Sequence, residues 1–190
     1  LCFRIVSRPR NWAGGEEMND CRMESEIRLQ GHVAEIVFRF RYDGDTAHEK
    51  RDQELPAVFV DSAYRNLVFY RGKKPWSDAP LTRTIPGWPN ERHRSDEEWV
   101  AYVDEKDWGI GLYTPGTHIL TAYRHRGLSG PKGSGCSYVA PLRRLAITPG
   151  FSLEYRVFLT IGEVGEIRKR FGKLRADRAD GRKPETEAGD

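Results

Sequence analysis

Apolar and polar residues alternate along much of this chain, which is the pattern of β-strands with one buried face. The alternation is clearest in residues 21–30 and 33–42, CRMESEIRLQ and VAEIVFRFRY, which are separated by Gly31 and His32. A glycine between two alternating runs is typical of a tight turn. These residues therefore predict an antiparallel hairpin that buries one face and leaves the other in water.

Seven more runs rich in β-branched and aromatic residues extend the prediction of strands. They are residues 55–61, 66–72, 99–103, 109–115, 117–125, 137–147 and 151–162. Between two of them, the charged sequence DEKDW has the length of a hairpin turn, and Gly109 and Gly111 after it allow close backbone packing or a bulge. About nine short strands joined mostly by turns predict an all-β fold, an antiparallel sandwich or barrel.

Two regions break this pattern. Residues 73–93 contain four prolines and no sustained period, which predicts a long irregular loop. Near the end of the chain, apolar residues at helical spacing predict one helix that begins near Glu163, and they are Val164, Ile167, Phe171 and Leu174. Residues 175–190 lack an apolar anchor. We therefore expect one domain over residues 1–174 and a disordered tail over 175–190.

Composition fits one soluble domain. The chain has 190 residues, of which 38% are hydrophobic and 31% charged, and no apolar run approaches the roughly 18 to 20 residues of a membrane helix. The net charge is +3, but residues 166–183 carry eight basic and three acidic residues, so the rest of the chain has a net charge of −2. A basic excess at the chain end is typical of a solvated tail, which argues against a nucleic-acid partner.

The cysteines limit the metal and redox chemistry to be expected, and the first residues indicate what kind of chain this is. Cys2, Cys21 and Cys136 are odd in number and widely spaced, so zinc ligation and CxxC redox chemistry are not expected. One disulfide in an exported protein and buried free thiols both remain open. The first residues, LCFRIVSRPRNW, lack an initiator Met and a signal-peptide pattern, which predicts a piece of a longer chain or a mature product.

No sequence motif names a reaction. The five histidines form no HExxH pattern, no GxSxG sequence is present, and GLSGPKGSG lacks the order of a phosphate-binding loop. We expect no metal and no cofactor. The polar segment 48–56 is the first candidate site, because Glu54 and Gln53 precede an apolar strand and lie near His48 in sequence. A shielded carboxylate and a histidine suit general acid–base chemistry, while the alternative is a solvated loop with Glu54 paired to an arginine.

Aromatic and basic residues in loops and at strand ends form the second candidate. Indole and phenol rings present an apolar face that suits the C–H face of a sugar ring, and Arg or His can bond to its hydroxyl or carboxylate groups. The alternative for the tryptophans is simple core packing. The predicted saccharide-binding residues are Gln53, Trp76, Trp88, Trp108, Tyr123 and Arg124, with Glu54, His48 and His125 as catalytic candidates.

Six segments resemble the β-sandwich region of bacterial carbohydrate-active proteins, the galactose-mutarotase-like supersandwich. They are QELPAVFV, LVFYRGKKPW, PGWPNE, WVAYVDEKDWGIGLYTPG, SYVAPLRRLAITPG and EYRVFLTIGEVGEIR, within residues 20–172. The resemblance implies an antiparallel β-sandwich, supersandwich-like, with a saccharide site on its concave sheet and an extracellular or periplasmic location. Enzymes of this type pair a His acid with a Glu base, which His48 or His125 and Glu54 would supply here.

Two classes of function follow. The first is a carbohydrate-recognising sandwich that is part of, or accessory to, a polysaccharide-active enzyme of the glycoside hydrolase, lyase or epimerase type. The second is a noncatalytic structural or protein-interaction sandwich, in which the proline-rich loop and the basic helix contact other chains. The sequence does not determine the oligomeric state.

Overall fold

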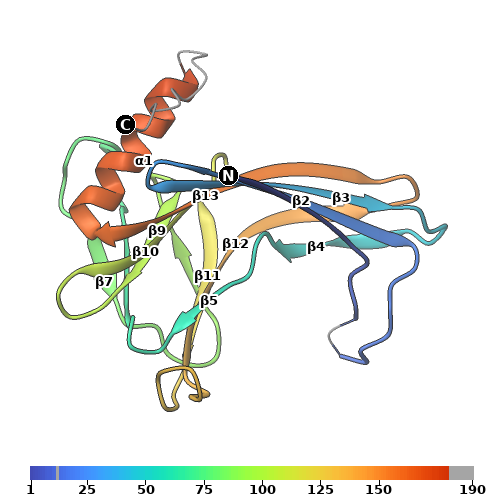
Figure 1. Ribbon diagram of the computed structural model, residues 1–190, viewed down its shortest axis with the longest axis horizontal. Coiled ribbons are helices and arrows are strands. Elements are labelled where there is room, and N and C mark those ends of the chain that lie inside the picture. The colour runs from blue at the N-terminus through green and yellow to red at the C-terminus, as the bar shows by residue number, and fades with distance from the viewer. Residues whose placement is uncertain (12, 180–190) are drawn as a thin grey trace.

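The computed structural model describes residues 1–11 and 13–179 and forms thirteen strands and one helix within them (Figure 1). The strands are β1 (Cys2–Ser7), β2 (Cys21–Gln30), β3 (Val33–Tyr42), β4 (His48–Glu54), β5 (Val58–Asp61), β6 (Asn66–Phe69), β7 (Thr82–Thr84), β8 (Glu91–Arg94), β9 (Trp99–Val103), β10 (Trp108–Tyr113), β11 (Ile119–His125), β12 (Cys136–Ile147) and β13 (Ser152–Glu163). The helix is α1 (Val164–Ala179). The prediction of an all-β sandwich with one C-terminal helix is confirmed.

The strands form two antiparallel sheets. The larger sheet has eight strands in the order β1-β2-β3-β13-β10-β9-β6-β7. The smaller sheet has the order β4-β12-β11-β8, and β5 pairs with β12 beyond the end of β4. The two sheets enclose a core of aliphatic and aromatic side chains to which Leu67, Leu112, Ala122, Val139 and Val157 contribute.

Local turn chemistry places the hairpins where the sequence predicts them. Gly31 has a φ of 53°, a left-handed backbone conformation that favours glycine. The last residue pair between β2 and β3, Gln30 with Val33, flanks this turn. In the β9–β10 turn, the Asp104 Oδ1 accepts hydrogen bonds from the backbone N–H groups of Lys106 (2.8 Å) and Trp108 (3.1 Å). A short side chain that bonds to the backbone two residues on stabilises such turns.

Four strands lie outside the nine expected segments: β1, β4, β7 and β8. Two of them, β7 and β8, lie inside residues 73–93, so only part of that segment is irregular. Strand β4 covers HEKRDQE, which the sequence predicts as a polar segment because it has no apolar alternation. Its hydrogen bonds to β12 make it a strand, and such a partner cannot be identified from local sequence.

Helix α1 covers the outer face of the larger sheet over β9, β10 and β13 (Figure 1). Its predicted apolar stripe is confirmed, since Val164, Ile167 and Phe171 are buried against Trp99 and Tyr113. The helix continues to residue 179, so the first five residues of the expected tail are helical. The remainder of that tail, 180–190, lies outside the described residues.

Glycine makes this close packing feasible. A Cβ on Gly111 of β10 would lie 2.4 Å from the Ile167 Cγ2 and 2.9 Å from the Phe171 Cε2 of the helix. Real Cβ atoms do not approach other atoms so closely, so a larger residue here would push the helix away from the sheet. The sequence predicts close packing or a bulge at Gly109 and Gly111, and at Gly111 the closely packed partner is helix α1.

A buried ion pair connects the helix to the sheet. The Glu97 side chain is fully buried, and its Oε1 accepts hydrogen bonds from the Trp76 backbone N–H (2.6 Å) and Arg168 Nη2 (2.5 Å). Its Oε2 accepts from the Trp99 indole N–H (2.7 Å) and Arg168 Nε (3.0 Å), while Arg168 Nη1 donates to the Ala79 carbonyl (2.7 Å). The expectation that the C-terminal basic residues are solvated is therefore wrong for Arg168.

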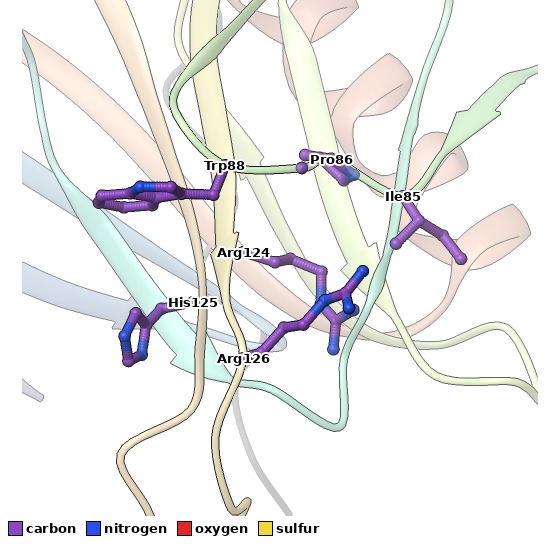
Figure 2. Close-up of a pocket in the computed structure, with 7 residues that line it drawn as sticks. Ile85, Pro86, Trp88, Arg124, His125 and Arg126 are labelled. Carbon is purple, nitrogen blue, oxygen red and sulfur yellow. The ribbon is translucent and has the colours of Figure 1, made fainter.

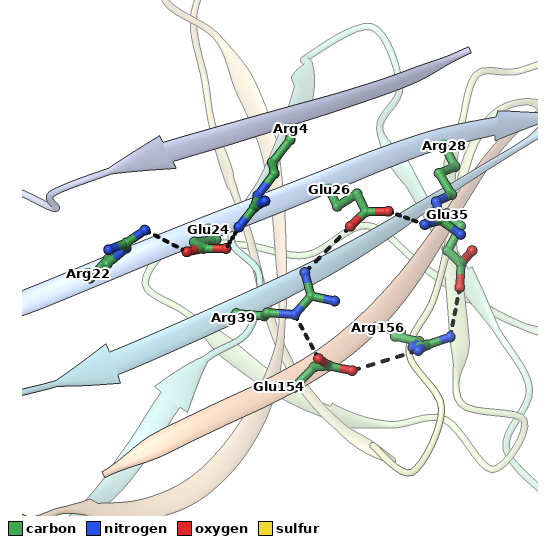
Figure 3. Close-up of polar contacts among 9 residues, drawn as sticks. All are labelled: Arg4, Arg22, Glu24, Glu26, Arg28, Glu35, Arg39, Glu154 and Arg156. Carbon is green, nitrogen blue, oxygen red and sulfur yellow. Dashed lines mark hydrogen bonds and ion pairs between the residues drawn. The ribbon is translucent and has the colours of Figure 1, made fainter. Parts of the chain in front are cut away.

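Charged side chains cover the outer face of β1, β2, β3 and β13 (Figure 3). Arginine and glutamate alternate across neighbouring strands there; for example, Arg39 bonds to Glu154 at 2.8 Å and lies 3.6 Å from Glu26. The linked residues are Arg4, Arg22, Glu24, Glu26, Arg28, Glu35, Arg39, Glu154 and Arg156. This face remains in water and offers no aromatic surface to a ligand.

Two further expectations concern described residues. Over residues 1–11 and 13–179, no helix has the length and apolar character needed to span a membrane. All three cysteines lie in this part of the chain and none forms a disulfide; Cys2 is exposed and Cys21 is buried. Of the two alternatives for the thiols, the structure therefore has free cysteines.

We predict that Gly111→Ala lowers the free energy of unfolding by about 1 to 3 kcal/mol, because the new methyl group overpacks the helix contact. Urea denaturation followed by circular dichroism measures the change. Gly165→Ala is the matched control: this helical glycine has open space around its Cβ position, so alanine should leave stability unchanged or raise it by up to about 1 kcal/mol. Equal effects of the two substitutions would contradict the close-packing account.

We predict that Glu97→Ala destabilises the fold by about 3 to 5 kcal/mol, since it leaves the Arg168 guanidinium buried without its partner. The measurement is the same denaturation experiment. Glu105→Ala provides the control, because Glu105 pairs with Arg65 at the surface and the loss there should be about 1 kcal/mol or less. A Glu97→Ala protein as stable as the control would show that the buried pair does not hold the helix in place.

Candidate functional site

A row of four aromatic rings crosses the outer face of the smaller sheet. The ring centroid of Phe59 (β5) lies 4.8 Å from that of Tyr138 (β12), and Tyr138 stacks on Tyr123 (β11) with 4.5 Å between centroids. Tyr123 in turn makes an edge contact with Trp88, with their ring centroids 4.9 Å apart. The two ends of the row are open to solvent: Phe59 is 60% and Trp88 is 67% exposed. Water therefore reaches the two ends of the row, while its centre is closed, since Tyr138 is only 3% exposed.

Strand register explains why these rings share one face. Tyr138 pairs with Phe59 on one side and with Tyr123 on the other. Because side chains alternate across a strand, the neighbours Val139 and Ala122 point the other way, into the core between the sheets. The aromatic row is thus the outward half of strands whose inward half holds the sandwich together.

Glu54 lies beside this row, at the end of β4. Burial, and after it the neighbouring Glu54 carboxylate, raises the pKa of the Tyr138 phenol well above its ordinary value. Burial also raises the pKa of Tyr123, and the nearby Cys136 thiol and Glu54 act in the same direction. Like an ordinary tyrosine, both phenols are protonated at neutral pH, and the Tyr138 O–H has the Glu54 carboxylate as its acceptor.

Trp88 is held by the loop that precedes β8. The Gly87 carbonyl accepts a hydrogen bond from the Arg124 backbone N–H (3.1 Å), and the Gly87 N–H donates to the Glu91 carboxylate (2.7 Å). On the other side of Trp88, the Asn90 side chain donates to the Thr121 hydroxyl (3.1 Å). The loop therefore runs alongside β11 as an extension of β8. Hydrogen bonds on both sides of Trp88 hold its exposed indole in position.

A pocket of about 610 Å³ opens next to this loop (Figure 2). In the figure the side chains of Trp88 and His125 lie to one side of the end of β11, and those of Arg124 and Arg126 lie to the other. The ring centroids of Trp88 and His125 are 6.3 Å apart. The pocket is lined by Ile85, Pro86, Gly87, Trp88, Arg124, His125 and Arg126.

The structure brings five of the nine predicted site residues to this region. Trp88, Tyr123 and Glu54 lie on or beside the aromatic row, and Arg124 and His125 line the pocket. Arg124 extends toward the interior side of the strand and donates to the Ser62 carbonyl at 3.0 Å. These five residues come from three separate parts of the sequence.

The other four predicted residues lie elsewhere. Trp76 packs beneath helix α1, on the far face of the larger sheet. Trp108 is 39% exposed and lies 6.0 Å from the ring of Tyr64, away from the aromatic row. His48 bonds to the Tyr42 hydroxyl (3.2 Å), and Gln53 points between the sheets because it pairs with the inward Arg143.

The two candidate histidines, His48 and His125, both lie far from the candidate base Glu54. His48 and Glu54 are six residues apart along β4, a span of roughly 20 Å. His125 pairs with Cys136 and Glu54 pairs with Leu142, so six residues of β12, again roughly 20 Å, separate their positions along the sheet. A general acid and base that act on one sugar carbon both need hydrogen-bond reach of the reacting atoms. This arrangement favours binding by these residues over concerted catalysis.

Sequence analysis missed three residues of the site: Phe59, Tyr138 and Arg126. Phe59 and Tyr138 belong to segments predicted as strands, and Arg126 begins the predicted glycine-rich loop, but only strand pairing places Phe59 against Tyr138. The alternation in PAVFVD, which exposes Phe59 when Val58 and Val60 are buried, was the available signal. The described residues also contain no group of three or more His, Cys, Asp or Glu side chains arranged to hold a metal ion.

Among solved structures, the chain is similar to a galactose mutarotase-like protein from Lactobacillus casei, with a TM-score of 0.51 and 10% identity over 84% of this chain and 69% of that chain. It is also similar to a GH36 α-galactosidase from Geobacillus stearothermophilus (TM-score 0.49, 12% identity, 76% of this chain and 22% of that one). A third is a putative aldose 1-epimerase from Klebsiella pneumoniae (TM-score 0.46, 12% identity, 93% and 54%). The first likeness shows that the chain has a galactose-mutarotase-like sandwich fold.

No protein-family model matches the sequence, and no curated protein matches it either. The fold resemblance implied by the sequence segments is therefore confirmed by structure alone.

Proposed function

We propose that this chain is a carbohydrate-recognising domain that binds a saccharide along the aromatic row of the smaller sheet. The observation that carries the proposal is Trp88, an indole that is 67% exposed and yet held in place against Tyr123. An exposed aromatic patch rimmed by polar groups, such as the one that Trp88 forms with the edge of Tyr123 beside His125, is typical of a ligand or partner site. A fixed, exposed indole therefore favours a binding surface.

The chemistry of the row suits a sugar. A pyranose ring has an apolar C–H face that packs on aromatic rings, and its hydroxyl groups need hydrogen-bond partners at the edges. Here Phe59 and Trp88 supply exposed aromatic surface, while Glu54, Tyr123 and His125 lie beside it as polar groups. Since the two exposed rings lie at opposite ends of the row, with buried Tyr138 between them, the surface suits an oligosaccharide or polysaccharide better than a single sugar.

The role within a larger protein is part of the same proposal. The fold is that of a protein called galactose mutarotase-like, and this likeness supports a carbohydrate-related domain. We place the chain as part of, or accessory to, a secreted polysaccharide-active enzyme of the glycoside hydrolase or lyase type. The separation of Glu54 from His125 favours a binding role for the residues described here.

We predict that Trp88→Ala weakens saccharide binding about tenfold or more, because it removes the most exposed ring of the row. A glycan array identifies the ligand, and isothermal titration calorimetry then compares the variants. Trp108→Ala is the matched control, since it removes an exposed indole outside the row and should change affinity by less than about twofold. The proposal fails when no saccharide binds, or when binding is the same with and without the Trp88 ring.

A second candidate function is protein interaction through strand β1. Among the residues that the structure describes, this edge strand pairs only with β2. All six of its residues are exposed, and Phe3 (55%), Ile5 (51%) and Val6 (52%) present apolar surface. An open strand edge with apolar side chains is a template for pairing with another chain. This observation favours the structural or interaction role that the sequence left open.

For this candidate we expect a concentration-dependent mass in light scattering that Ile5→Lys reduces to the monomer. The charge would oppose strand pairing at the edge without touching the core. Lys50→Ile, on the exposed strand β4 of the other sheet, is the control and should not restore or remove association. A strictly monomeric wild-type chain at high concentration would exclude self-association through β1.

A further inference from the structure

We infer that the saccharide bound at this site carries an anionic group, a carboxylate or a sulfate ester, which Arg124 and Arg126 hold in the pocket beside Trp88. The inference rests on the proposed function and adds the chemical class of the ligand. Three observations lead to it: the charge of the pocket, the unsatisfied donor of Arg124 and the placement of both guanidinium groups on one side of the strand end.

The pocket has two guanidinium groups and no acidic side chain in its lining. Within the described residues, neither Arg124 nor Arg126 forms an ion pair. On the larger sheet, by contrast, exposed arginines such as Arg39 and Arg156 each contact a glutamate (Figure 3). The pocket therefore carries positive charge that the protein itself does not neutralise, as a site for an anion requires.

Glu91 is the carboxylate of the neighbouring strand, and it is already engaged. Its Oε1 accepts the Gly87 N–H at 2.7 Å, and its Oε2 lies 3.4 Å from the His93 Nε2. These contacts fix the loop that carries Trp88. Glu91 thus organises the pocket wall and leaves the arginines available.

Arg124 has a buried donor without a partner. Its Nη2 donates to the Ser62 carbonyl at 3.0 Å, but no acceptor in the described structure meets its buried Nε–H. A buried, charged donor without an acceptor costs free energy, and native proteins rarely leave one unmatched. The Nε atom is sealed from solvent, so this mismatch adds to the uncompensated positive charge at the pocket and is not itself a contact for a ligand.

The two arginines are arranged to act together. They are two residues apart at the end of β11, so their side chains leave the strand on the same side, as Figure 2 shows. The backbone N–H of Arg124 is held by the Gly87 carbonyl, which keeps this strand end close to the Trp88 loop. Trp88 lines the same pocket, but its indole lies on the other side of the strand end from the two guanidinium groups (Figure 2). A saccharide that stacks on the indole and extends past the strand end would place an acidic substituent at the guanidinium groups.

Guanidinium chemistry favours an oxyanion over a neutral hydroxyl. The planar fork of arginine donates two parallel hydrogen bonds to a carboxylate or sulfate, and such charge-assisted bonds are roughly twice as strong as neutral ones. A neutral sugar would meet these donors with single hydroxyl acceptors and leave both positive charges uncompensated. Uronate and sulfated saccharides share the required chemistry.

The test compares matched saccharides by isothermal titration calorimetry on the full chain. One pair is an oligogalacturonate and its methyl ester, and the other is a sulfated galactan oligosaccharide and its desulfated form. We expect one acidic ligand to bind about tenfold or more tightly than its neutral form, as one charge-assisted contact implies. The pair that shows this difference identifies the group as a carboxylate or a sulfate.

Variants connect this difference to the pocket. Arg126→Gln removes an exposed guanidinium without disturbing the core, and it should abolish most of the preference for the acidic ligand. Arg41→Gln, which removes the same charge from the larger sheet, should leave the preference intact. Arg124→Lys keeps the charge but loses the fork, so we expect an intermediate preference, with circular dichroism confirming that the variant folds.

Three results separate the possible failures. Equal binding of acidic and neutral forms that still depends on Trp88 would overturn the anionic ligand and leave the saccharide site standing. Binding of polyglutamate as tight as that of the acidic sugars, and indifferent to Trp88→Ala, would show a general attraction for polyanions and overturn the inference. Absence of binding to every saccharide would overturn the proposed function together with the inference.

Discussion

Backbone pairing along β12 is the constraint on which the candidate site depends. One edge of this strand bonds to β11, and the other edge bonds first to β5 and then to β4. The pairing sets Phe59, Tyr138 and Tyr123 side by side and brings Glu54 next to them. A shift of one residue in the register of β12 would turn Tyr138 into the core and separate Phe59 from Tyr123.

The outer faces of the two sheets are covered by different kinds of side chains and elements. Helix α1 covers part of the larger sheet, held by Gly111 and by the buried contact between Glu97 and Arg168, and paired arginines and glutamates cover the rest. Helix α1 buries the Trp99 and Tyr113 rings beneath it, and the paired arginines and glutamates present charge. The smaller sheet carries an aromatic row whose two ends, Phe59 and Trp88, are open to water. A pocket lies beside Trp88, and its two arginines form no ion pair with any described residue.

Some residues that the sequence predicts to bind a ligand are instead packed inside the protein. Trp76 and Trp88 both lie in the proline-rich segment and look alike in sequence, yet one is packed under the helix and the other is exposed. The difference arises because the backbone N–H of Trp76 bonds to buried Glu97, whereas Gly87 connects the Trp88 loop to β11. Both partners are distant in sequence from the residue they position.

The sequence by itself determined the strands that alternate, the hairpin turns at Gly31 and after Val103, the apolar stripe of the helix and the sandwich class. These features depend on local periodicity and turn chemistry, which adjacent residues encode. Only the tertiary structure decided that polar β4 is a strand, that Phe59 meets Tyr138, and that Arg124 lies beside Trp88. These contacts join segments tens of residues apart, and their free energy comes from pairing and burial that no single segment contains.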